Sequence, residues 1–220
     1  MLVDHREDLV KDRTGHINRL RWHLHEIDPE WDPQPRSLVR YRTLDAVASK
    51  LAGISSMVAR IAGDLLIRIR ELTVAINALE REITTRTNEL APTLIAVPGV
   101  GALTAAKIVA ETADINRFKS KDAYARHNGT APVPVWSGNR ERHRLSRTGN
   151  RQLNCAIHRI AITQKRCHPD ASDYLEHRRQ MGNSNTEALR ALKRRLSDIV
   201  YRALLQDAQP TAATCIAHAA

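Results

Sequence analysis

The sequence of 220 residues has few aromatic and cysteine side chains, and neither set is arranged for a common function. Aromatic residues make up 4% of the chain, with a single phenylalanine, so recognition of unpaired bases by aromatic stacking is poorly supported. Cys155, Cys167 and Cys215 are widely separated and form no CxxC pair, which argues against a zinc site or a disulfide framework and favours a reducing compartment. The histidines are scattered, and His23 with His25 lacks the spacing that places two metal ligands on one helix face.

Long apolar stretches are also missing from the sequence. No run approaches the about 20 apolar residues of a membrane-spanning helix, and no signal-peptide core follows Met1. We therefore expect a cytoplasmic protein that makes no membrane contact.

Positive charge is abundant, and it is concentrated in the second part of the chain. The formal net charge is +10, yet residues 1–90 hold 14 Lys and Arg against 14 Asp and Glu, so the whole excess lies in residues 91–220. Eight basic side chains fall within residues 137–166, accompanied by the single acid Glu141. A basic surface so localised favours a nucleic-acid partner over an ordinary solvated face.

The first 90 residues show the periodicity of helices. Apolar residues at three- and four-residue spacing predict a helix from about Val3 to Glu26, and Pro29, Pro33 and Pro35 then interrupt the pattern. Residues 58–90 carry a heptad repeat with Ala62, Ile69, Ile76, Ile83 and Leu90 at a and Val58, Leu65, Leu72 and Leu79 at d. Such a stripe favours a homo-oligomeric coiled coil. The alternative is packing on the first helix of the same chain.

The segment after Pro92 resembles a helix-hairpin-helix, at about residues 94–116. Its turn is Pro98-Gly99-Val100-Gly101, and a helix with Leu103, Ala106 and Val109 follows. Glycines permit a close approach of backbone to phosphate, and the N–H groups that open the next helix attract an anion. Gly99 and Gly101 are therefore candidate phosphate contacts. An ordinary helical corner could use the same glycines.

Residues 130–151 form a loop dense in arginine, with at most a short β-ribbon between Val133 and Arg144. Ser137 and Gly138 come first, and the basic side chains follow as Arg140, Arg142, Arg144, Arg147 and Arg151. Arginine provides permanently charged, planar donors for phosphate oxygens. Asn150 is expected to cap the next helix, in which Leu153, Ile157 and Ile160 face inward, while Arg151, Arg159 and Arg166 lie on another face.

The remaining sequence predicts a last helix and a tail. Ser184 and Glu187 form a capping box before a helix whose outer face carries Lys193, Arg194 and Arg195. The fold class is thus mainly helical: long antiparallel or coiled-coil helices in residues 1–90, a compact helical domain in residues 91–207, and a flexible tail in residues 208–220.

Three stretches together resemble the insertion-sequence 110 (IS116/IS110/IS902) family of transposases. They are VPGVGALTAAKIVAE, RFKSKDAYARHNGTAPVPVWSGNRERHRLSRTGNRQL and REDLVKDRTGHINRLRWHL. The motifs P-G-x-G, G-x-x-P-x-x-x-x-S-G and S-x-x-G-N-R-x-L occur in the family's order. The resemblance covers the coiled-coil region and the C-terminal transposase domain, and therefore nearly the whole chain.

The resemblance implies a DNA recombinase of insertion sequences, in some members guided by a structured RNA. The family's serine nucleophile corresponds to Ser137, with Ser146 as the rival. The nucleic-acid contacts are then expected at Gly99, Gly101, Gly138, Arg140, Arg142, Arg144, Arg147, Asn150 and Arg151. The expected location is the cytoplasm of a bacterium, at the nucleoid.

We expect the family's N-terminal RuvC-like domain, whose four carboxylates bind Mg²⁺, to be absent from this sequence. Asp4, Glu7, Asp8 and Asp12 occupy surface positions of the first helix, so we expect no cofactor in this chain. Two functions stay open. The chain is either a truncated transposase that needs the missing domain for serine-mediated strand exchange, or a catalytically silent dimeric module that binds DNA or RNA.

Overall fold

The computed structural model describes residues 1–138, 140–144 and 148–209, and it divides the chain into two compact units. The first unit is Met1–Glu82 and the second begins at Ile83. Most described residues lie in helices, and the only strands among them form one short ribbon. The prediction of a mainly helical chain with at most a short ribbon is therefore confirmed.

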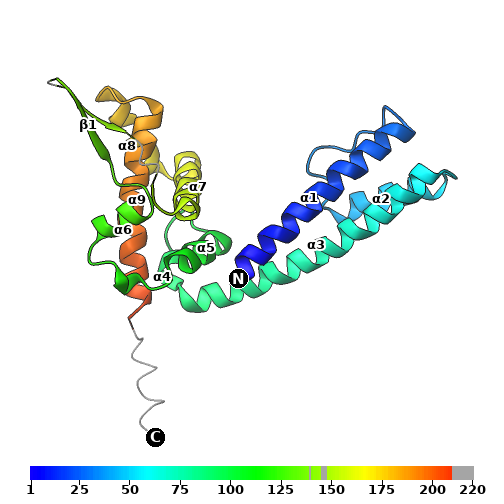
Figure 1. Ribbon diagram of the computed structural model, residues 1–220, viewed down its shortest axis with the longest axis horizontal. Helices are drawn as coiled ribbons and strands as arrows, with labels where there is room; N and C mark the ends of the chain where they lie inside the picture. The colour runs from blue at the N-terminus through cyan, green and yellow to red at the C-terminus, as the bar shows by residue number, and fades with distance from the viewer. Residues whose placement is uncertain (139, 145–147, 210–220) are drawn as a thin grey trace, which may run out of the picture. The chain divides into compact units, whose positions relative to one another are not determined.

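The first unit is built from α1 (Leu2–Ile27), α2 (Tyr41–Ala52) and the greater part of α3 (Met57–Leu90) (Figure 1). Residues 28–40, which contain the three prolines, form turns between α1 and α2, as expected. Arg6 Nε donates to Glu80 Oε1 at 3.0 Å, and Arg13 Nη1 donates to Thr73 Oγ1 at 3.3 Å. From the first of these contacts to the second, the residue number rises along α1 and falls along α3, so the two helices run antiparallel.

The heptad stripe of α3 is largely buried within this unit. Ala62 and Ile69 are fully buried in a cluster with Leu20 and Leu24 of α1 and with Leu44 of α2. The alternative interpretation, packing of the stripe on the first helix, therefore accounts for this part of the repeat. Self-association through residues 58–90 stays a prediction.

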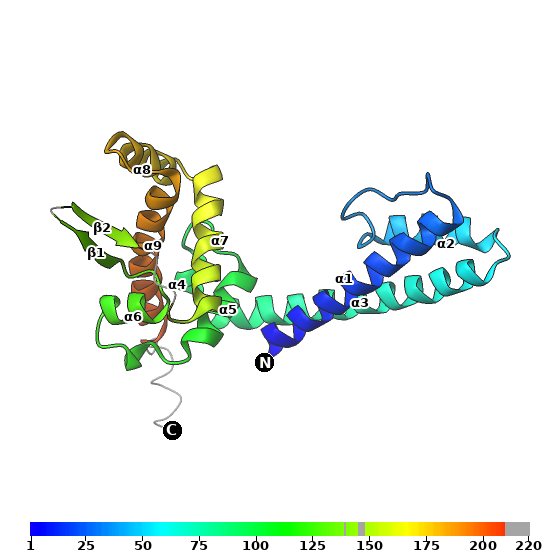
Figure 2. The ribbon, with the colours of Figure 1, turned by 45° about the horizontal axis from the view of Figure 1, so that its top comes forward.

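Within the described residues, the second unit contains the end of α3, eight shorter elements and the long helix α9 (Figure 2). In chain order, the elements after α3 are α4 (Pro92–Ile95), α5 (Ala102–Thr112), η1 (Ile115–Arg117), α6 (Lys121–His127), β1 (Val133–Ser137), β2 (Arg140–Arg144), α7 (Arg151–Cys167), α8 (Pro169–Gln180) and α9 (Asn185–Asp207). The long helix α9 contacts α4, α6, α7 and α8. Leu153, Ile157 and Ile160 of α7 are fully buried in the core of this unit, as their spacing predicted.

Side chains at both ends of α9 take part in helix capping. At its start, Ser184 Oγ accepts from the Glu187 backbone N–H at 3.3 Å, and the Glu187 carboxylate accepts from the Ser184 N–H at 2.9 Å, so the predicted capping box is confirmed. At its end, the Asp207 carboxylate accepts from the backbone N–H groups of Thr93 and Leu94 at 2.8 and 3.0 Å. Asp207 thereby caps α4 and ties the last helix of the unit to the first.

Residues 169–180 form α8, on which only Ala171 and Leu175 are buried. One expectation about α9 needs correction. Lys193 does not lie on the outer face of α9, since 8% of its surface is exposed. Its ammonium is turned toward α7, where Asn154 accepts a hydrogen bond from it.

Candidate nucleic-acid interface at the β-hairpin

The strands β1 and β2 form an antiparallel hairpin whose turn contains the Ser-Gly pair. The register runs from Val133 opposite Arg144 to Ser137 opposite Arg140, so the turn begins at Gly138. Gly138 has a φ of +59°, which two-residue hairpin loops require and which glycine adopts without strain. The backbone of Ser137 therefore lies beside the tip of the hairpin.

Several predicted site residues fall outside what the structure describes. Arg147 and Ser146 lie outside the described residues altogether. The backbones of Ser137, Arg140 and Arg142 are placed in the hairpin, but their side chains are not described. Their predicted roles stay predictions.

The base of the hairpin is held by a close crossing of its two ends. Gly149 has a φ of +95°, and a Cβ atom there would lie 2.6 Å from the carbonyl oxygen of His127 and 3.0 Å from that of Arg126. Gly129 has a φ of +70°, and its Cβ would lie 2.9 Å from the carbonyl oxygen of Thr148. Both positions therefore require glycine for backbone conformation and for space. Neither glycine was among the predicted site residues, although each follows a helix or precedes one.

Asn150 fixes the start of α7 immediately after this crossing. Its Oδ1 accepts from the backbone N–H groups of Gln152 and Leu153, both at 2.9 Å, which confirms the predicted cap. Its Nδ2 donates to Glu111 Oε2 of α5 at 2.7 Å, and its backbone N–H donates to the His127 oxygen. These bonds commit most of the Asn150 amide to positioning the hairpin, so its predicted contact with nucleic acid has little hydrogen-bonding capacity left.

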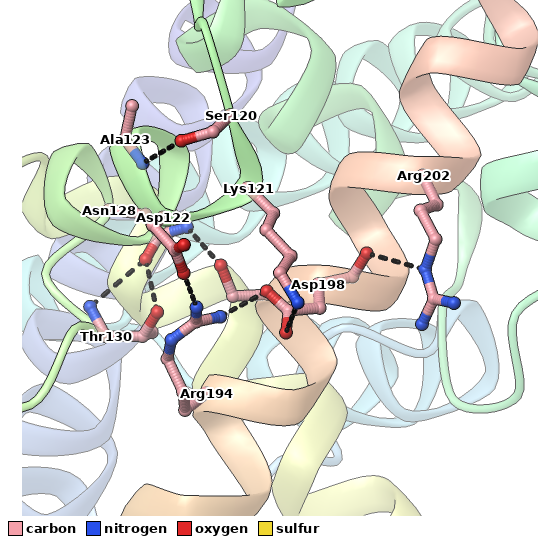
Figure 3. A network of polar contacts seen from close by, with 10 residues as sticks. Ser120, Lys121, Asp122, Ala123, Asn128, Thr130, Arg194, Asp198 and Arg202 are labelled. Carbon is pink, nitrogen blue, oxygen red and sulfur yellow. Dashed lines mark hydrogen bonds and ion pairs between the residues drawn. The ribbon is translucent and has the colours of Figure 1, made fainter.

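A buried polar network links the hairpin to α7 and α9. Asn128 Nδ2 donates to Ser197 Oγ at 2.8 Å, while its Oδ1 accepts from the Thr130 hydroxyl at 2.7 Å (Figure 3). The carbonyl oxygen of Asn128 accepts from Asn154 Nδ2 at 2.9 Å, and Asn154 Oδ1 accepts from Lys193 Nζ at 2.7 Å. Each buried polar group thus has a partner, and the chain that enters β1 is anchored to two helices.

Arg194 joins α9 to α6 beside this network. Its guanidinium pairs with Asp198 on its own helix and with Asp122 at the start of α6, and Lys121 approaches Asp198 at 3.8 Å (Figure 3). Arg194 was predicted on an outer basic face. Because two carboxylates balance its charge, it contributes little free positive charge to the surface.

The Pro-Gly-Val-Gly turn connects α4 to α5 and packs against α7. Gly99 has a φ of +82°, and a Cβ there would lie 3.1 Å from Gln164 Cγ and 3.4 Å from the Ile160 carbonyl oxygen. Gln164 Nε2 also donates to the Pro98 oxygen at 2.6 Å. The packing of the turn on α7 therefore explains by itself why glycine is needed at position 99. Gly101 is the N-cap of α5 and has open space around it, so of the two glycines it is better placed for an external anion.

The residues described here offer no metal centre. No group of three or more His, Cys, Asp or Glu side chains within residues 1–138, 140–144 and 148–209 could hold a metal ion. The Mg²⁺ expected for intact members of the resembled family therefore has no fitting ligand set in this part of the chain. The described helices likewise include none with the length and hydropathy of a bilayer span.

The sequence around this site matches known transposases. Residues 91–176, from α4 through most of α8, match the family described as "Transposase IS116/IS110/IS902 family". This range includes the Pro-Gly turn, the hairpin and its clamped base, so the unit that carries them is a transposase domain. The chain belongs to the IS116/IS110/IS902 family, as its motifs indicated.

Several bacterial relatives extend the similarity beyond this domain. The insertion element IS116 uncharacterized 44.8 kDa protein of Streptomyces clavuligerus is 29% identical over 94% of this chain and 63% of the relative. The insertion element IS110 uncharacterized 43.6 kDa protein of Streptomyces coelicolor is 31% identical over 75% of this chain and 38% of its own length. The transposase for insertion sequence element IS1111A of Coxiella burnetii is 30% identical over 64% of this chain. The chain thus spans about two fifths to three fifths of these relatives.

Proposed function

We propose that this chain binds DNA and takes part in transposition by exchanging phosphodiester bonds through Ser137. The observation that carries the proposal is the register of the hairpin, in which Ser137 pairs with Arg140 across the turn at Gly138. A serine beside an exposed turn can reach a phosphate group that a flat surface could not approach. The glycine crossing at Gly129 and Gly149 holds the other end of the hairpin in place.

The proposed step conserves the number of phosphodiester bonds. The Ser137 hydroxyl oxygen attacks phosphorus, so that a Ser–O–P bond forms while one P–O bond to a sugar breaks. The serine gives its proton to a base, and the departing sugar oxygen takes up a proton. A sugar hydroxyl of another strand then attacks the phosphorus of this serine ester. A P–O bond to that sugar forms and the Ser–O–P bond breaks, so the serine is released and the DNA is rejoined without an external energy source.

Positive charge near the turn would stabilise this step. Negative charge builds on the phosphoryl oxygens in the transition state, and arginine donors aimed at them lower its energy. β2 carries Arg140, Arg142 and Arg144 within five residues. Arg144 is exposed at the end of the strand opposite Val133, which places it at the base of the hairpin.

Any requirement for Mg²⁺ would have to be met by carboxylates outside the described residues, for instance in a longer protein or in a second protein. The proposal therefore includes an activity in trans, in which a longer relative contributes such carboxylates. The alternative, a silent module that binds nucleic acid, predicts binding without any covalent step. A guide RNA stays a prediction under both functions.

Trapping of a covalent protein–DNA adduct separates these functions. The chain is incubated with nicked duplexes that carry an insertion-sequence end, together with an intact relative whose own serine is replaced by alanine. We expect a denaturant-resistant adduct with this chain. The adduct should be lost in Ser137→Ala and kept in Ser146→Ala, because only the former removes the proposed nucleophile.

The control is the ability of each variant to bind the same duplex. Ser137→Ala should bind as the unchanged chain does, since one hydroxyl contributes little to contacts dominated by charge. Failure to form any adduct in the presence of the intact relative would refute the catalytic proposal. An adduct that survives Ser137→Ala but disappears in Ser146→Ala would assign the chemistry to the rival serine.

A further inference from the structure

Four basic side chains gather where α7 and α9 meet. Lys193 Nζ donates to Asn154 Oδ1 at 2.7 Å, which brings the two helices together. Arg151 precedes Asn154 by three residues and Arg190 precedes Lys193 by three, so each arginine lies on the same helix face as the residue in that bond. His158 lies one turn beyond Asn154 on α7. We call Arg151, His158, Arg190 and Lys193 the α7–α9 cationic cluster.

The charge of this cluster is not balanced within the described residues. Arg151, Arg190 and Lys193 form no ion pair with any carboxylate in the part of the chain that the structure describes, whereas Arg194 of α9 and Lys121 of α6 do so. Lys193 is buried, and its only hydrogen-bond acceptor among the described residues is a neutral amide oxygen, Asn154 Oδ1. A buried ammonium without a counter-ion is costly, and neighbouring cations increase the cost.

The electrostatic consequences are visible at two residues. Burial lowers the pKa of Lys193, and the nearby Arg151 and Arg190 lower it further. Burial also lowers the pKa of His158, with a second contribution from Lys193. The ammonium of Lys193 is therefore held here against electrostatic opposition, while the imidazole of His158 is mostly neutral at pH 7. An anion at the cluster would relieve both the desolvation and the repulsion.

The N-terminus of α7 does not itself bind an external anion through its backbone. The N–H groups of Gln152 and Leu153 are already bonded to Asn150 Oδ1, so they are not available to an external anion. The cluster also lacks aromatic rings that could stack on bases. Its chemistry fits the phosphates of a nucleic-acid backbone, which side-chain cations contact without reading sequence.

We propose that the α7–α9 cationic cluster binds backbone phosphates of the same DNA duplex that the hairpin engages. This inference rests on the proposed function. Only residues 145–150 separate the end of β2 from Arg151, so hairpin and cluster are neighbours along the chain. Five residues of strand extend about 17 Å, and the major groove of B-DNA is about 12 Å wide. A duplex that meets the tip of the hairpin is therefore within reach of a contact near its base.

The salt dependence of duplex binding tests the cluster. The double variant Arg151→Gln and Arg190→Gln removes two cluster charges, and the matched control Arg42→Gln and Arg60→Gln removes two exposed arginines of the first unit. If each cluster arginine neutralises one phosphate, the logarithmic salt slope falls by about 1.8 and affinity at 0.15 M salt falls about 30-fold. The control should keep the slope of the unchanged chain.

Two results of this measurement have different meanings. If the unchanged chain shows no salt-dependent binding to a 30-base-pair duplex, about three helical turns long, the proposed function itself fails. If the chain binds but both double variants lose affinity equally, the proposed function stands and the cluster inference is overturned, because only overall charge would matter. Thermal unfolding of each variant verifies that the fold is intact.

Cysteine labelling tests independently whether DNA covers the same surface. Cys155 is exposed one turn after Arg151, and Cys167 is exposed at the other end of α7. In a Cys215→Ser background, saturating duplex should slow alkylation of Cys155 at least fivefold and leave Cys167 unchanged. Equal rates at Cys155 with and without duplex would overturn the inference. Protection by a structured RNA of the same length but not by duplex DNA would also overturn it, in favour of RNA at this surface.

Discussion

The glycine crossing at the base of the hairpin leads to a quantitative prediction about stability. Replacing Gly149 by alanine places a methyl group 2.6 Å from the His127 carbonyl oxygen and 3.0 Å from that of Arg126, in a backbone with a φ of +95°. The left-handed conformation alone costs a non-glycine residue about 1–2 kcal/mol. The overlap is with backbone atoms that cannot rotate away, so we expect a further cost of about 1–3 kcal/mol from forced displacement.

Gly138→Ala is the matched control for this variant. Its φ of +59° is also left-handed, but a Cβ there meets nothing within 4 Å. The control should therefore lose only the conformational part, about 1–2 kcal/mol. Because 1 kcal/mol shifts Tm by roughly 3 °C in a unit of this size, Gly149→Ala should melt about 3–9 °C below Gly138→Ala.

Thermal and urea unfolding, followed by circular dichroism, measure this difference. If the urea midpoint falls while the m-value, the slope of the unfolding free energy against urea concentration, stays unchanged, the substitution has lowered stability without changing cooperativity. Equal destabilisation by the two alanines would refute the reasoning, since it would mean that the two ends of the hairpin do not cross as closely as described. In that case the rigid mounting of Ser137 would lose its structural basis as well.

Two more predictions concern the helices around the hairpin. Asn150→Ala should lower the free energy of unfolding by about 1–2 kcal/mol in urea titrations, because two capping bonds disappear and Glu111 loses a hydrogen-bond donor. The control is Ser184→Ala, which removes the exposed cap of α9. If Asn150→Ala lowers the free energy of unfolding no more than this control, Asn150 does not bridge α7 and α5 as described. Burial raises the pKa of Tyr124 to about 12, with an opposing contribution from its hydrogen bond to Thr112. Stability should therefore be constant with respect to this group below pH 10 and fall by about 2–3 kcal/mol as pH rises toward 12, and Tyr124→Phe should abolish that component of the pH profile.

Much of the helical architecture could be predicted because it depends on local patterns. The three- and four-residue spacing of apolar side chains predicted the inward face of α7, and the Ser184 to Glu187 capping box predicted the start of α9. No helix was predicted for residues 169–180, where α8 buries only Ala171 and Leu175 and so shows almost no apolar stripe. A helix stabilised by few core contacts has a weak periodic signal.

The parts of the site that depend on distant contacts were less accessible from the sequence. Lys193 lies on a helix among basic neighbours, and nothing in its local pattern shows that its ammonium donates a hydrogen bond to Asn154. Gly129 and Gly149 are ordinary turn glycines by composition, and only the crossing of two segments explains why neither tolerates a side chain. By contrast, the capping role of Asn150 was predicted correctly, because helix capping is a local signal.

The hydrogen bonds from Thr93 and Leu94 to the Asp207 carboxylate have a topological consequence. They hold residues 93 and 94, near the start of the family match at residue 91, beside residue 207 at the end of α9. Residues 93–207 could therefore be re-threaded as a circular permutant, with a short peptide joining residue 207 to residue 93 and new ends opened in the turn between α8 and α9.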